Sequence, residues 1–197
     1  MESLPLWIVA GCWVLFVLVW IVLALGARKD AYSQSIDERE PYSIPFVASL
    51  ACLAISMHGP LGPDEGMRIM FARLVPLSPA LAWTGAVMAL AALFLALWAR
   101  LALGRNWSGM VGLKDGHELV TSGPYAAIRH PIYTALILLV LATVLMNRTA
   151  LALVALVLMT LSCWIKLRAE EDMMSEAFPD AYPAYMARTR RLVPGLV

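Results

Sequence analysis

Two short segments combine ionisable and aromatic side chains at the borders of hydrophobic runs, where such side chains can do chemistry. Residues 129–133 read RHPIY and open one run, and residues 166–172 read KLRAEED and close the next. Ionisable groups at a membrane boundary cost free energy unless they are paired or used. In a purely structural interpretation, His130 anchors the boundary and the second segment is a charged helix end. In the alternative, functional interpretation, the two segments form a site.

The two segments are expected to meet in space. The hydrophobic runs that they border, residues 132–146 and 151–165, are separated only by the three polar residues 147–149 and by Ala150. In a helical hairpin with so short a turn, the start of one helix returns beside the end of the other. The spacing therefore predicts that the two segments lie next to each other at one end of the hairpin.

Particular side chains can be placed within this corner. Lys166 and Glu170 share a helix face and could pair, because residues four apart on a helix are neighbours. We expect His130 and Tyr133 to face this pair across the hairpin. The preceding polar segment, residues 100–131, holds five glycines, which permit close approach of the backbone to a ligand. These features together predict one pocket, although a long solvated loop is the structural alternative for residues 100–131.

The composition indicates that the solvent of most of this chain is lipid. Hydrophobic residues make up 61% of its 197 residues and charged residues 15%, whereas soluble domains are about a quarter charged. A net charge of +1 suggests no binding to nucleic acid. Cys12, Cys52 and Cys163 lie inside hydrophobic runs, and no Cys/His cluster has metal-ligand spacing. We expect neither a structural disulfide nor a bound metal.

Five hydrophobic runs predict the fold class, an all-α integral membrane protein with about five transmembrane helices, the last two forming a tight hairpin. The first run is about as long as a helix that crosses roughly 30 Å of hydrocarbon. A cleaved signal peptide is its alternative, disfavoured by its length and by Glu2. The second run is interrupted by prolines, and the last two are short for a span. The runs are residues 6–25, 42–61, 74–99, 132–146 and 151–165.

The distribution of basic residues predicts the orientation, because cytoplasmic loops collect Lys and Arg. With five spans and the N terminus outside, the cytoplasmic side receives Arg28, Lys29, Arg39, Arg100, Arg105, Lys114, Arg129, Lys166, Arg168, Arg188, Arg190 and Arg191. The outer side receives Arg68, Arg73 and Arg148. We therefore divide the chain into residues 1–99, with three transmembrane helices, and residues 100–197, a catalytic region with its polar segments in the cytoplasm.

Four motifs in this second region resemble the isoprenylcysteine carboxyl methyltransferase family and, more widely, the phospholipid methyltransferases. The motifs are GHELVTSGPY at 116–125, RHPIY at 129–133, EE at 170–171 and FPDAYPAY at 178–185. The resemblance covers roughly residues 100 to 195. It implies a membrane methyltransferase that uses S-adenosyl-L-methionine in a cytoplasmic pocket without a Rossmann domain, and no G-x-G-x-x-G motif follows a plausible strand.

The resemblance also implies roles for individual residues. A carboxylate and aromatic rings suit the ammonium and the sulfonium of this cofactor. Family members commonly hold an arginine, tied to the acceptor carboxylate, where this chain has Lys166, which keeps the charge but loses the planar fork. The residues that match the cofactor pocket are His117, Glu118, Leu119, Val120, Tyr125, His130, Pro131, Ile132, Tyr133 and Glu170.

The resemblance implies carboxyl O-methylation of an isoprenylcysteine-like substrate, and an amine acceptor is the alternative. A carboxylate is already ionised at neutral pH, so it needs no general base, and Lys166 or Arg129 could orient it. An amine, such as a phosphatidylethanolamine head group, must lose a proton, and Glu171 is then a candidate base. Either acceptor should be lipophilic, a membrane lipid or a lipidated molecule, because the site opens at the bilayer interface.

Two further interpretations compete with methyl transfer. One is a membrane reductase of related fold that uses a nicotinamide cofactor, whose phosphates would need more basic residues than Arg105, Lys114 and Arg129. The other is a membrane protein that keeps the fold without catalysis. The membrane that holds the protein and its oligomeric state stay open, since the small residues at 86–92 could pack against a helix of the same or another chain.

Overall fold

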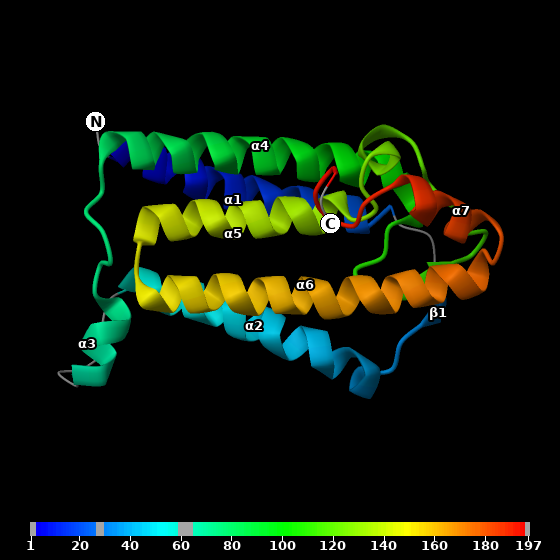
Figure 1. Ribbon diagram of the computed structural model, residues 1–197, viewed down its shortest axis with the longest axis horizontal. Coiled ribbons are helices and arrows are strands. Elements are labelled where there is room, and N and C mark those ends of the chain that lie inside the picture. The colour runs from blue at the N-terminus through cyan, green and yellow to red at the C-terminus, as the bar shows by residue number, and fades with distance from the viewer. Residues whose placement is uncertain (1–2, 27–29, 59–64, 196–197) are drawn as a thin grey trace.

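The computed structural model of the protein describes residues 3–26, 30–58 and 65–195. Long helices run side by side, with short elements at their ends (Figure 1). Arg28 and Lys29, which count toward the predicted cytoplasmic side, and the last residues of the second predicted run lie outside the described residues. In chain order the elements are α1 (Ser3–Ala24), β1 (Asp30–Ser33), α2 (Ile36–His58), α3 (Glu65–Phe71), α4 (Pro79–Leu103), η1 (Gly104–Asn106), β2 (Gly112–Lys114), η2 (Gly123–Ala126), α5 (Pro131–Asn147), α6 (Ala150–Ala177) and α7 (Ala181–Arg188).

Four helices in the described part of the chain are long and apolar enough to cross a membrane, namely α1, α2, α4 and α6. The apolar helix α5 has 17 residues. At 1.5 Å per residue it is about 25 Å long, slightly less than the roughly 30 Å of hydrocarbon in a bilayer. A helical, multi-pass membrane protein is thus confirmed, while the predicted total of five spans depends on α5 and stays a prediction.

The two last long helices form the predicted hairpin. Arg148 turns the chain, since its backbone is in the left-handed region with a φ of 58°. Thr149 then caps α6, because its hydroxyl accepts a hydrogen bond from the main-chain N–H three residues later. α6 continues well beyond the hydrophobic run that predicts it, to Ala177. The charged segment 166–172 is therefore helical and keeps a fixed orientation relative to α5.

A two-stranded antiparallel ladder is the one addition to the predicted helical class among the described residues. β1 pairs with β2, so the connection between α1 and α2 is joined to the polar segment 100–131. Gly112 permits this pairing, because a Cβ atom there would lie 2.5 Å from the carbonyl oxygen of Tyr32. The ladder was not predicted, because its strands have only four and three residues.

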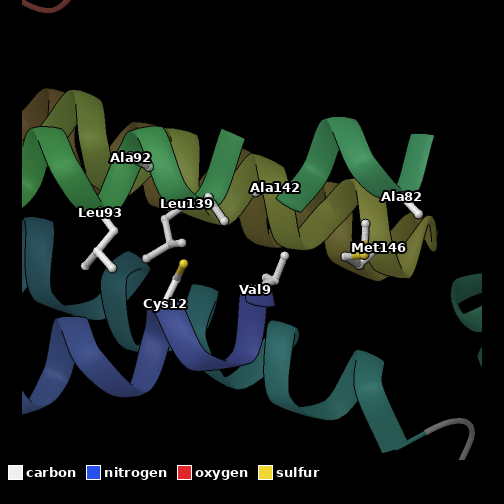
Figure 2. Packing of buried hydrophobic residues seen from close by; sticks show 9 residues of the cluster. Val9, Cys12, Ala82, Ala92, Leu93, Leu139, Ala142 and Met146 are labelled. Carbon is white, nitrogen blue, oxygen red and sulfur yellow. The ribbon is translucent and has the colours of Figure 1, made fainter. Parts of the chain in front are cut away.

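Helix α5 lies at the centre of the bundle because two hydrophobic clusters share it. One cluster joins α1, α4 and α5, and the other joins α2, α5 and α6. Figure 2 shows the first cluster, in which Cys12 of α1 lies close to Leu139 of α5. Ala86, Ala89 and Ala92 of α4 are completely or almost completely buried. These three alanines therefore serve packing within the chain, whereas Ala91 is exposed.

All long helices place one of their ends at the same side of the bundle (Figure 1). The C-terminal ends of α1, α4 and α6 meet there with the N-terminal ends of α2 and α5 and with α7. The opposite side holds α3 and the turn between α5 and α6. The polar segments 100–130 and 178–195 thus gather at one end, where the predicted site residues lie.

Candidate functional site

A cavity of about 740 Å³ lies at this end of the bundle. It is lined by side chains from α1, α2, α5, α6 and α7 and from the segment between α4 and α5. Pro131 and Glu171 are the two predicted site residues that are not among its lining residues. The predicted site residues that do line it are His117, Glu118, Leu119, Val120, Tyr125, Arg129, His130, Ile132, Tyr133, Lys166 and Glu170.

The corner between α5 and α6 contains the predicted group around Glu170. The Tyr133 hydroxyl donates a hydrogen bond to Glu170 Oε1 at 2.5 Å. His130 Nδ1 lies 3.6 Å from Glu170 Oε2, and the rings of His130 and Tyr133 stack with their centroids 5.5 Å apart. Pro131 occupies the first turn of α5, where its missing N–H removes no helical hydrogen bond. The structure thus brings His130, Tyr133 and Glu170 together at the cavity wall.

Lys166 lies in the same cavity, but its hydrogen-bond partner is not Glu170, the residue that its i, i+4 spacing suggests. Its ammonium donates a hydrogen bond to the main-chain carbonyl of Gly109 at 2.6 Å, in place of the i, i+4 pairing with Glu170. The ammonium also lies 5.5 Å from the ring centroid of Tyr42 and 5.8 Å from that of Tyr133. These distances are favourable for cation–π attraction. Lys166 therefore connects α6 to the segment that covers the cavity.

Glu171 is held on the other side of α6 by two arginines and a histidine. Its Oε1 accepts from Arg129 Nε at 2.8 Å and lies 3.3 Å from His130 Nε2. Its Oε2 accepts from Arg191 Nε at 2.9 Å. We call Glu171, Arg129 and Arg191 the clamp. The Glu171 side chain is 6% exposed and does not line the cavity, so the carboxylate at the centre of the clamp lies behind the cavity wall.

The clamp fastens the segment 186–192, which we call the C-terminal strap. Arg129 Nη1 donates to the carbonyl of Thr189 at 2.6 Å, and the main-chain N–H of Arg129 donates to the carbonyl of Arg190 at 2.7 Å. The main-chain N–H of His130 donates to the carbonyl of Arg191 at 3.0 Å. The strap therefore supports the residues that precede α5. This role of Arg191 was not predicted, because adjacent arginines near a membrane are first interpreted as topology signals.

Three tyrosines make the wall beside α7. The Tyr185 hydroxyl donates to the main-chain carbonyl of Tyr125 at 2.7 Å, and the rings of Tyr182 and Tyr185 are 5.8 Å apart. Burial raises the pKa of Tyr125 well above its ordinary value and that of Tyr185 to about 12. These phenols are therefore neutral at physiological pH, and the Tyr185 hydroxyl acts as a hydrogen-bond donor.

The charge of His130 depends on two opposing effects. Burial by itself lowers its pKa, but hydrogen bonds with Glu170 and Glu171 and the charges of both glutamates outweigh burial. The pKa of His130 is consequently raised above its ordinary value of 6.5. In a protonated His130, the Nδ1–H group would point to Glu170 at the cavity wall and the Nε2–H group to Glu171 in the clamp.

An aromatic wall on α1 and α2 was not predicted. Trp13, Phe16 and Trp20 of α1 and Phe46 of α2 line the cavity. The Phe16 and Trp20 rings stack at 4.1 Å, and the Trp20 ring lies 6.4 Å from that of Trp107. The sequence indicated only that the first spans are hydrophobic. The spacing of Trp13, Phe16 and Trp20 at three and four residues is the signal that could have identified this face.

The lining suits a ligand with a positive group and a hydrophobic part. Glu170 offers a carboxylate, the tyrosines offer aromatic faces, and α1 and α2 offer apolar surface. Lys166 adds one cation, which could receive an anionic group. Among the described residues, no group of three or more His, Cys, Asp or Glu side chains could hold a metal ion.

Comparisons with known proteins agree with the motifs in the second half of the chain. The cobalt-zinc-cadmium resistance protein CzcN of Cupriavidus metallidurans is 31% identical over 97 residues, which are 48% of this chain and 44% of that protein. The chain thus spans less than half of the length of this curated relative. The model of the isoprenylcysteine carboxyl methyltransferase (ICMT) family matches residues 85–176. This match, which includes α5 and most of α6, supports membership of the chain in the isoprenylcysteine carboxyl methyltransferase family.

Proposed function

We propose that this protein transfers a methyl group from S-adenosyl-L-methionine to the carboxylate of an isoprenylcysteine-like lipid at the membrane interface. The family match indicates a membrane methyltransferase. The observation that carries the finer proposal is that one cavity is lined by the Glu170 carboxylate, by the Lys166 ammonium and by apolar side chains of two membrane helices. A lipid with an anionic head and a cofactor with cationic groups would find complementary surfaces there.

The lining residues fit the proposed cofactor. When bound, S-adenosyl-L-methionine supplies a methyl group that is carried on a sulfonium. Once the methyl group is transferred, the sulfonium becomes a neutral thioether, which is the leaving group. Glu170 would hold the cationic end of the cofactor, since Tyr133 and His130 orient its carboxylate. Tyr125 and residues 117–120 would line the remainder. Enclosure by these side chains would exclude water and orient the two reactants, the two contributions that an already activated methyl donor requires of a protein.

A carboxylate acceptor agrees better with the cavity than an amine acceptor. A carboxylate needs no base, and Lys166 could orient it by exchanging its bond to Gly109 for one to the acceptor. An amine would need a proton acceptor, and Glu171, the candidate base, is held by Arg129 and Arg191 outside the cavity lining. The arrangement of Glu171 therefore supports carboxyl methylation and makes phosphatidylethanolamine the weaker alternative.

A nicotinamide-dependent reductase also agrees less well with the cavity than a methyltransferase does. Of the three basic residues considered for its phosphates, Arg129 lines the cavity but is bound to Glu171. Arg105 and Lys114 are not among the lining residues. Calorimetric titration of the purified protein in detergent with S-adenosylhomocysteine and with NADPH tests this choice. Binding of S-adenosylhomocysteine alone is expected, and binding of NADPH alone would overturn the proposed cofactor.

Substitutions of Lys166 test the acceptor. We expect Lys166→Met to keep the affinity for S-adenosylhomocysteine and to lower methyl transfer to a prenylcysteine analogue about tenfold or more, since 1.4 kcal/mol of lost orientation corresponds to tenfold. Lys166→Arg should restore much of the activity, and Arg168→Met, an exposed position on the same helix, is the matched control. If Lys166→Met transfers methyl groups to phosphatidylethanolamine as fast as the wild type or faster, the amine acceptor is supported instead.

We further propose that α5 is a fifth span, with the N terminus outside and the cavity on the cytoplasmic side. The support is the twelve-to-three division of basic residues. Arg105 lies at the cavity end of the bundle and is exposed, whereas Ala72 is exposed near the opposite end. In intact cells, an impermeant thiol reagent should label Ala72→Cys and leave Arg105→Cys unlabelled. The reverse pattern would contradict the orientation.

A further inference from the structure

The cavity continues from the polar corner into the membrane-spanning part of the bundle. Phe16 and Val17 of α1, Phe46 and Leu50 of α2 and Leu136 of α5 line this continuation, which we call the apolar arm. All of these side chains are hydrocarbon, so the arm offers no polar partner to a ligand. Because it is continuous with the site around Glu170, it would receive the tail of an acceptor whose head group lies there.

The depth of the apolar arm can be followed along α1. Trp20 lies at the level of the site, since its ring contacts the Trp107 ring beside the polar corner. Trp13 is the deepest residue of α1 in the lining, seven positions further toward the N terminus. At 1.5 Å per residue this is about 10 Å along the helix. Val9 and Cys12, the next buried residues of α1, belong to the core with α4 and α5 and not to the lining.

Trp13 is held at this depth by its own hydrogen bond. Its indole N–H donates to Thr143 Oγ1 of α5 at 2.9 Å. Thr143 is 2% exposed, and its hydroxyl donates in turn to the carbonyl of Leu139 at 2.9 Å. Trp13 also packs against both hydrophobic clusters, which share α5. A ring fixed in this way cannot turn aside without leaving a polar group unpaired in an apolar environment.

We propose that Trp13 closes the apolar arm and sets the longest acceptor tail that the enzyme accepts. This inference rests on the proposed function, because it assigns the arm to the lipid tail of the acceptor. A tail that ends before the Trp13 ring fills the arm, whereas a longer tail meets the ring and must bend or leave the arm. Trp13 is thus a residue for specificity, and Thr143 is the residue that positions it.

Acceptors of graded tail length test the role of Trp13. Methyl transfer to N-acetylcysteine carrying a geranyl, farnesyl or geranylgeranyl group is measured for the wild type and for Trp13→Ala. We expect the ratio of kcat/KM for the longest tail to that for the shortest tail to rise about tenfold or more, the scale on which a hydrophobic pocket distinguishes tails of different length. Thr143→Val, which frees the ring, should raise the same ratio by a smaller factor.

Two further variants keep the test decisive. Trp13→Leu retains an apolar side chain if Trp13→Ala does not fold, and it should change the ratio in the same direction. Trp7→Ala removes a tryptophan from the same helix at a position that is 70% exposed to lipid, and it should leave the ratio unchanged. An unchanged ratio in both Trp13 variants, or an equal change in Trp7→Ala, would overturn the proposal.

A second measurement does not depend on the proposed reaction. Geraniol, farnesol and geranylgeraniol carry the same tails without a carboxylate, and their binding is detected as a rise in Tm. We expect geranylgeraniol to raise the Tm of Trp13→Ala more than that of the wild type. If the wild type methylates none of the prenylcysteines but this shift is observed, the proposed acceptor is wrong and the role of Trp13 stands. If the shift is absent, Trp13 does not close the arm.

Discussion

Two neighbouring glutamates of α6 serve two different regions of the molecule. Glu170 belongs to the cavity wall, where Tyr133 donates to it and 23% of its side chain is exposed. Glu171 belongs to the clamp, where 6% of its side chain is exposed and Arg129 and Arg191 bind it. One step along a helix turns the side chain by about 100°, and here that step separates a side chain that lines the cavity from an interior ion pair.

The comparison suggests that removing either charge has a different consequence. The cavity wall should govern affinity for the cofactor, because its carboxylate is accessible to a ligand. The clamp should govern stability, because its charges compensate one another away from solvent. If both glutamates acted in the same way, variants of the two positions would change the same quantity.

Glu171→Gln should destabilise the folded protein by about 3–5 kcal/mol. It removes the common partner of Arg129 and Arg191 and leaves buried positive charge without compensation, which is the costly way to break a buried ion pair. Thermal unfolding in detergent measures the effect. Asp172→Asn, an exposed carboxylate next along the helix, is the control and should change Tm little. If Glu171→Gln has the same Tm as the wild type, the ion pairs of the clamp do not stabilise the folded protein.

Glu170→Gln should weaken binding of S-adenosylhomocysteine while changing Tm less than Glu171→Gln does. A charge-assisted hydrogen bond to a partly desolvated carboxylate is worth about 1.5–3 kcal/mol, which corresponds to roughly 10- to 150-fold in Kd. Calorimetric titration of both variants checks this contrast. Wild-type affinity in Glu170→Gln would contradict the assignment of Glu170 to the cofactor.

Arg191→Met should destabilise the protein by about 1 kcal/mol, less than the loss of Glu171. Arg191 is 32% exposed, so its ion pair lies between the exposed and the buried cases. Arg191→Lys should recover part of the loss, since a lysine keeps the charge without the two-bond geometry of the guanidinium. Unfolding experiments compare the two variants. If both are as stable as the wild type, Arg129 and the main-chain bonds hold the strap without a contribution from Arg191.

The smallest effect concerns pH, because His130 contacts both regions. A pKa raised in the folded state means that protonation of His130 contributes stability fully below its ordinary pKa of 6.5. This contribution is lost as the pH rises through the raised value. The Tm advantage of the wild type over His130→Gln should therefore shrink by about 2–4 °C at most, the effect of roughly 1 kcal/mol in a chain of this size.

Measurement of Tm for both proteins between about pH 6 and pH 9 makes this comparison. Glu170, Glu171 and the stacked Tyr133 face His130 and remain in both proteins, so their own titration cancels to first order. A Tm difference that stays constant over this range would show that His130 does not change its charge there.

Much of the site corner followed from local rules. A three-residue turn between two hydrophobic runs predicts that the start of α5 lies beside the end of α6, and His130 and Tyr133 are indeed beside Glu170. The same rules failed for Lys166, whose spacing suggested Glu170 as its partner. Its observed partner is a carbonyl of Gly109, in a segment with no regular pattern. Contacts with irregular segments depend on the path of the backbone, which helical periodicity does not describe.

The sequence by itself determined which segments prefer lipid, where the hairpin turns and which side chains share a helix face. These properties depend on composition and on residues a few positions apart. The tertiary structure alone decided that Trp13 lines the cavity and bonds to Thr143, that Arg191 completes the clamp and that α5 lies between two cores. The physical reason is that a helix hydrophobic on all sides carries no contrast between its lipid-facing and inward faces, so close packing against its neighbours selects the inward face.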